Sequence, residues 1–142
     1  MFTQILIGCV LTLGTIIVAS LGWWVLESAI RRLHRWALRP PHGPKLMLVL
    51  VMSLTWNLVI IVIAVLLWAL AYAFLGIFAT FEAAVYFALV AFTTLGFGDI
   101  LLPTEWRLLG GMAAANGLLL FGLITAILVE TLRDTRQRQR RD

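Results

Sequence analysis

The sequence is poor in charged residues. They make up 13% of the chain, whereas hydrophobic residues make up 62%. A soluble domain carries about a quarter charged residues, so this shortage excludes an ordinary water-soluble fold. The mean hydropathy of +1.00 agrees with a chain that lies mostly within a bilayer. We therefore expect an integral membrane protein.

Cysteine and catalytic clusters are also scarce. Cys9 is the single cysteine, so an intrachain disulfide is excluded, and it lies in an apolar stretch where free cysteine commonly packs as a small apolar side chain. Histidine, cysteine and acidic residues do not recur at catalytic or metal-ligand spacing, and the sequence has no nucleotide-binding loop. We therefore expect neither an enzyme nor a cofactor.

Long apolar runs dominate the sequence. A helix needs about 20 apolar residues to cross the ~30 Å hydrocarbon core of a bilayer. Residues 2–26, 46–75 and 108–129 each meet this requirement and contain no charged side chain. The sequence therefore predicts an all-α integral membrane protein with three transmembrane helices.

All basic residues except Arg107 gather in two short segments, which flank the second and third apolar runs. Basic residues at the ends of such runs mark the cytoplasmic side of a plasma or inner membrane, so the net charge of +4 does not indicate nucleic acid. This rule places the N-terminus outside and the C-terminus in the cytoplasm. We also expect anionic lipid at the arginines of both segments: Arg31, Arg32, Arg35, Arg133, Arg136 and Arg138.

The segment between the first two runs contains two signals. Residues 31–39 are basic with interleaved apolar residues, which favours a short helix at the lipid headgroups. Residues 40–44 are rich in proline and glycine, so we expect them to end any helix and turn the chain.

A shorter apolar stretch covers residues 79–92 and contains neither glycine nor proline. Thr80 is a suitable N-cap, and Glu82 lies in the first turn, where the helix dipole favours a carboxylate. A helix of this length reaches roughly 20 Å, which is too short to cross the bilayer. The sequence predicts a re-entrant helix that enters from outside and stops midway.

The residues that follow carry a motif: Thr93-Thr94-Leu95-Gly96-Phe97-Gly98-Asp99. Irregular backbone at membrane depth is tolerated only inside protein or along a watery cavity. In this position the motif resembles the potassium-channel signature, and the chain is similar to bacterial channels with two transmembrane helices and a pore loop, with an extra N-terminal helix. The resemblance implies a fourfold homotetramer whose filter binds K⁺ through backbone carbonyls of Thr94, Leu95, Gly96 and Phe97.

The resemblance also assigns roles around the filter. Gly96 and Gly98 accept backbone angles that other residues avoid. Asp99 becomes the carboxylate at the filter mouth. Thr93, Tyr86 and Phe87 become supporting residues, the two aromatics as a cuff around the filter.

Two further expectations concern single positions in the family pattern. Val90 takes a supporting place where some bacterial members carry a carboxylic acid, so we expect Asp99 to lack that partner. Gly117 falls at the gating hinge of the inner helix, with Gly122 five residues further on. Close packing of helices is the alternative explanation for both glycines.

These signals divide the chain into four parts: an extra transmembrane helix (1–30), a basic cytoplasmic linker (31–45), a pore domain (46–132) and a basic cytoplasmic tail (133–142). We expect passive, selective K⁺ conduction. One alternative is a weakly selective monovalent cation channel, with a filter loosened by Leu95 in place of valine or isoleucine. The other is a non-conducting membrane subunit that keeps the fold as a scaffold or regulator.

Overall fold

The computed structural model describes the backbone of residues 1–37 and 42–139. Side chains are not described at the following helical positions: 31, 33–37, 42–43, 46, 131, 134–136 and 138–139. The elements in chain order are α1 (Phe2–Ala37), α2 (His42–Phe74), α3 (Phe81–Phe92), the 3₁₀ helix η1 (Thr104–Trp106) and α4 (Arg107–Gln139). The described residues contain helices and no strand, so the predicted all-α class is confirmed.

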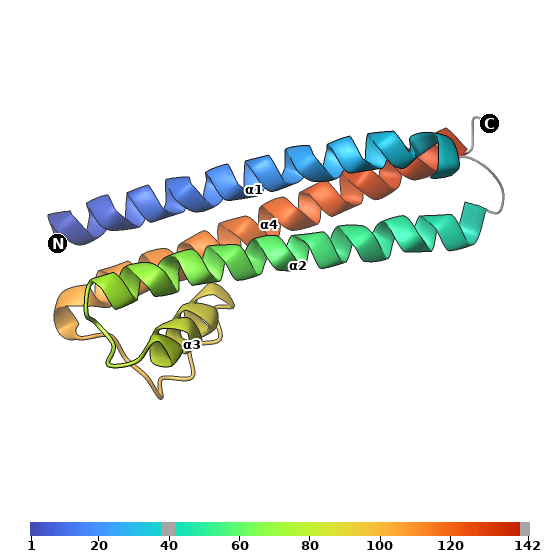
Figure 1. Cartoon of the computed structure of the whole chain (residues 1–142). Coiled ribbons are helices and arrows are strands. Elements are labelled where there is room, and N and C mark those ends of the chain that lie inside the picture. Colours follow the sequence, from blue (N-terminus) through green and yellow to red (C-terminus); the bar gives the residue numbers. More distant parts are fainter. Residues whose placement is uncertain (38–41, 140–142) are drawn as a thin grey trace.

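Three long helices run side by side, and α3 lies beside them near the end that holds the N-terminus (Figure 1). Each long helix contains a segment that is long and apolar enough to cross a membrane: Phe2–Ile30, Met47–Phe74 and Thr104–Glu130. The protein is therefore a multi-pass membrane protein. With 12 residues, α3 is much shorter than these segments, as the sequence predicts.

The region between α1 and α2 differs from expectation. The predicted short headgroup helix is the continuous end of α1, which runs to Ala37 because no helix breaker precedes Pro40. The helix α2 already begins at His42, and Pro44 lies in its first turn, where the missing amide hydrogen costs no helical hydrogen bond. Residues 38–41 lie outside the described part.

Aromatic rings fix α3 against α2. Trp68 and Tyr72 of α2 are fully buried. Tyr72 packs edge-to-face on Phe87, with ring centroids 5.5 Å apart, and Trp68 packs in the same manner on Phe92 at 6.2 Å. Ala88 of α3 is also fully buried, so the two helices approach closely. The position of α3 therefore depends on apolar contacts at both its middle and its end.

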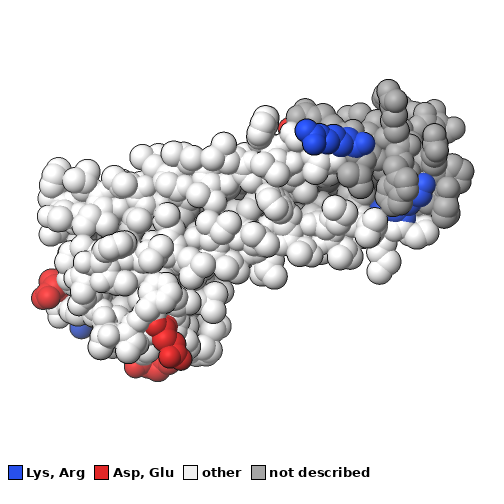
Figure 2. All heavy atoms as spheres, viewed as in Figure 1, with Lys and Arg blue, Asp and Glu red and all other residues white. Residues whose placement is uncertain are grey.

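Charge is separated along the molecule. Figure 2 shows a largely uncharged lateral surface, with most of the visible basic side chains at one end and most of the visible acidic ones, together with a basic one, at the end where α3 lies. Glu82, Asp99 and Glu105 are exposed at the α3 end. Arg32 and Arg133 are exposed near the carboxyl ends of α1 and α4. The other side chains predicted to meet anionic lipid lie outside the described residues: Arg31, Arg35, Arg136 and Arg138.

Candidate functional site

The start of α3 follows the sequence signals. Thr80 has an extended backbone, and its hydroxyl oxygen accepts a hydrogen bond from the amide of Ala83 at 3.2 Å. This bond satisfies one of the amides that every helix leaves unpaired in its first turn. Glu82 lies in that turn, so the predicted N-cap and acidic residue are confirmed.

The end of α3 turns the chain sharply. The amide of Thr94 donates to the carbonyl of Ala91 at 3.0 Å, and the amide of Leu95 donates to the carbonyl of Val90 at 3.1 Å. This pair of bonds is a Schellman motif, which requires a left-handed residue after the helix. Thr94 takes that conformation, with φ of 57°, although β-branched residues disfavour it. Backbone strain is therefore concentrated where α3 ends.

Residues 93–99 continue as irregular backbone with alternating handedness. Thr94, Gly96 and Gly98 have φ angles of 57°, 57° and 77°, whereas Leu95 and Phe97 between them do not have positive φ. No backbone amide of the described chain donates to the carbonyls of residues 94–98. These carbonyls therefore remain free to bind another partner. They would need such a partner if another molecule buried the segment.

The same segment is exposed on a single copy of the chain. The side chains of Leu95 and Phe97 are 56% and 65% exposed, and every residue from 93 to 98 is exposed. Thr93 turns its hydroxyl back toward α3, where it donates to the carbonyl of Leu89 at 2.9 Å. Apart from this bond and the turn, little of the chain covers the segment.

Asp99 has a partner that the sequence analysis missed. The hydroxyl of Tyr86 donates to a carboxylate oxygen of Asp99 at 2.6 Å. This bond is the main reason that the pKa of Asp99 lies below its ordinary value and the pKa of Tyr86 lies above its own. Tyr86 lies four residues before Val90, on the same face of α3, so helical spacing was the signal that pointed to it.

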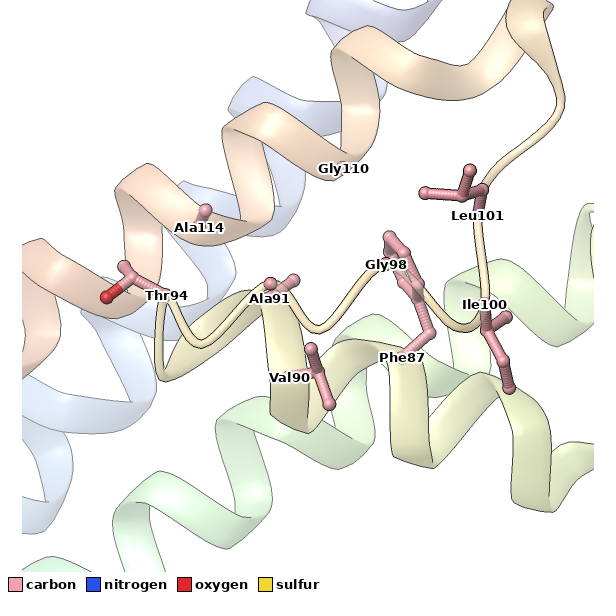
Figure 3. Close-up of a pocket in the computed structure, with 10 residues that line it drawn as sticks. Phe87, Val90, Ala91, Thr94, Gly98, Ile100, Leu101, Gly110 and Ala114 are labelled. Atoms are coloured by element: carbon pink, nitrogen blue, oxygen red, sulfur yellow. The ribbon is translucent and has the colours of Figure 1, made fainter.

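A cleft of about 290 Å³ lies behind the segment, between α3 and α4. Figure 3 shows residues 94–101 passing between the two helices, with the ring of Phe87 directed toward Gly98. Val90 also lines this cleft from α3, and Gly110 and Ala114 line it from α4. Phe87 thus reaches both the aromatic cluster on α2 and the space behind the segment.

Comparison with known proteins identifies the family. A family model described as an ion channel matches residues 60–134, which is more than half of the chain. The chain belongs to this ion-channel family. Searches of curated proteins and of solved structures found no match.

The matched residues include the second part of the channel's α2, from residue 60 onward, all of α3, the segment 93–99 and most of α4, so they contain the whole candidate site. The channel's α1 lies outside the match.

The two predicted hinge glycines of α4 have different surroundings. A Cβ atom at Gly117 would lie 2.2 Å from the carbonyl oxygen of Phe92 and 2.6 Å from its Cα, whereas a Cβ at Gly122 would meet nothing within 4 Å. Gly117 therefore lets α4 touch the backbone at the end of α3. This contact explains the glycine by packing, and the hinge role of both positions stays a prediction.

Proposed function

We propose that the chain is the subunit of a homotetrameric, potassium-selective channel, which conducts K⁺ passively with residues 93–99 as its selectivity filter. The observation that carries this proposal is the alternation of left-handed φ at Thr94, Gly96 and Gly98. In a regular strand successive carbonyls point to opposite sides. Alternating handedness instead turns them toward one side, and rings of carbonyls are what replaces the hydration shell of K⁺.

The proposed ion ligands are the backbone carbonyls of four residues: Thr94, Leu95, Gly96 and Phe97. One copy of the chain supplies only one side of each carbonyl ring, so a closed ring requires copies related by a rotation axis. The exposure of Leu95 and Phe97 supports this assembly, because neighbouring copies would cover both apolar side chains. Fourfold symmetry follows from the motif's family resemblance.

The surroundings of the segment favour a cation. The carboxyl end of α3 meets the start of the segment, and the helix dipole gives that end a partial negative charge. Glu82, Asp99 and Glu105 outnumber the exposed Arg107 at the α3 end, so this end is acidic and would attract cations from solution. We assign this end to the outside, with the N-terminus, and the basic end to the cytoplasm, where Arg32 and Arg133 would meet anionic lipid.

Membership of an ion-channel family agrees with transport rather than catalysis, so the proposal needs no cofactor. The test is ion flux into vesicles that hold purified protein. We expect K⁺ to enter rapidly and Na⁺ to enter far more slowly, with four chains per complex by native mass spectrometry. Equal K⁺ and Na⁺ fluxes would support the weakly selective alternative. No flux from an intact tetramer, across pH, voltage and anionic lipid content, would support the non-conducting one.

A further inference from the structure

The helix α1 is attached along α4, although it lies outside the part of the chain that matches the family. Near its start, the side-chain amide of Gln4 accepts a hydrogen bond from the amide of Leu109 at 3.3 Å and donates to the carbonyl of Glu105. One turn later, Gly8 lies directly against the side chain of Met112. The first half of α1 therefore follows the first half of α4.

The next contact is a buried polar pair. Thr15 of α1 is 0% exposed and Asn116 of α4 is 2% exposed. The side-chain amide of Asn116 donates to the hydroxyl oxygen of Thr15 at 2.8 Å, while that hydroxyl lies 2.8 Å from the carbonyl of Thr12. Both residues lie inside membrane-spanning segments, where polar side chains need a protein partner. The pair therefore links α4 to α1 through a buried polar contact at one defined level of the two helices.

The polar pair is adjacent to the contact between α4 and α3. Gly117 follows Asn116 in the chain and touches the backbone of Phe92, the last residue of α3. The Schellman turn and the strained Thr94 come directly after Phe92. A continuous set of contacts therefore leads from Thr15 on α1, through α4, to the inner end of residues 93–99.

We infer that Thr15 is a positioning residue: through Asn116 it holds α4 against the end of α3 and thereby keeps the inner end of the filter in its conducting conformation. This inference rests on the proposed channel function. It assigns α1 a part in conduction, beyond anchoring the chain in the membrane.

The test compares single-channel recordings of Thr15→Val with those of the wild-type protein. Valine keeps the shape of threonine but gives Asn116 no acceptor, so α4 is held less firmly at the level of Phe92. We expect the open probability to fall about threefold, the effect that an average interhelical hydrogen bond in a membrane supports. Thr15→Ser keeps the hydroxyl and should restore the wild-type value.

Two further variants separate positioning from stability. Ser53→Ala also removes a buried hydroxyl, but that hydroxyl donates to Val49 within α2, so the open probability should not change. The double variant Thr15→Val with Asn116→Leu removes both polar groups and should restore the thermal stability of the tetramer. Its open probability should stay low, because the hydrogen bond is still missing.

The outcomes are distinct. If wild type conducts and Thr15→Val has an unchanged or raised open probability, the inference is wrong while the channel function stands. If the double variant regains both stability and open probability, Thr15 acts only through stability, and the inference is again wrong. If the wild-type protein does not conduct K⁺, the proposed function fails and the inference fails with it.

Discussion

Gly96 and Gly98 have left-handed φ angles of 57° and 77°, yet a Cβ atom at either position would meet nothing within 4 Å. Backbone direction therefore requires glycine there, and lack of space does not. Gly117 is the reverse case, because its φ is not left-handed and a Cβ would overlap the backbone of Phe92. Gly76, in the turn before α3, resembles the first two, with φ of 65° and open space around it. Gly96 and Gly76 therefore form a matched pair, because both have left-handed φ and open space but only Gly96 lies in the proposed filter.

Gly96→Ala should impair conduction more than Gly76→Ala does. Each change places an alanine in the left-handed region, which costs roughly 1–2 kcal/mol, so both should lower stability by a similar amount. Only the first change also redirects proposed ion-binding carbonyls. We expect Gly76→Ala to conduct K⁺ selectively and Gly96→Ala to lose conduction or selectivity, as measured by vesicle flux. Equal fluxes from both variants would show that residue 96 does not line the ion path.

The bond between Tyr86 and Asp99 predicts a pH effect. The Tyr86 hydroxyl stabilises the ionised carboxylate, so the pKa of Asp99 is lowered and its charge persists to lower pH than in a free aspartate. In Tyr86→Phe the pKa should rise toward the ordinary value. We therefore expect single-channel conductance to fall at a higher external pH in this variant than in the wild type.

A matched control for this prediction is Tyr72→Phe, since the Tyr72 hydroxyl is buried and has no hydrogen-bond partner among the described residues. That variant should keep the wild-type acid dependence, and Asp99→Asn should abolish it. Acid dependence that is the same in Tyr86→Phe and in the wild type would show that Asp99 does not control cation entry.

At the scale of elements, local signals in the sequence were sufficient for α3. The cap at Thr80, the acidic Glu82 and the uninterrupted apolar stretch predicted a short helix, because capping and dipole effects act within one turn. The bond from Tyr86 to Asp99 joins residues 13 apart, and the bond between Thr15 and Asn116 joins residues 101 apart. The spacing of Tyr86 and Val90 on one face of α3 pointed to the first pair. No sequence pattern encodes the second pair, because only the packing of α1 against α4 brings it together.

The contact between α4 and α3 predicts opposite results for two glycine substitutions. Gly117→Ala should destabilise the protein by at least about 1–3 kcal/mol, since the added methyl group meets rigid backbone rather than a mobile side chain. Gly122→Ala should leave stability unchanged or raise it by up to about 1 kcal/mol through helix propensity. Thermal unfolding in detergent measures both. A Gly117→Ala protein as stable as Gly122→Ala would contradict the contact.

At the scale of the molecule, composition predicted the membrane class, and the long apolar runs predicted the all-α fold and the three spans, since each span needs only length and hydrophobicity. The continuous helix through Ala37 was not predicted, because basic residues and a following proline-rich stretch suit both a separate headgroup helix and the end of a long one. A single copy leaves residues 93–98 exposed with unpaired carbonyls. An assembly around an axis would give this segment its partners.

The most direct test of the account is the reversal potential of single channels in a planar bilayer, with K⁺ on one side and Na⁺ on the other. We predict a reversal potential near the potassium equilibrium value, because rings of carbonyls from residues 94–97 would replace the hydration shell of K⁺. A reversal potential near zero would contradict the central claim, since it would show a pore that passes both cations alike.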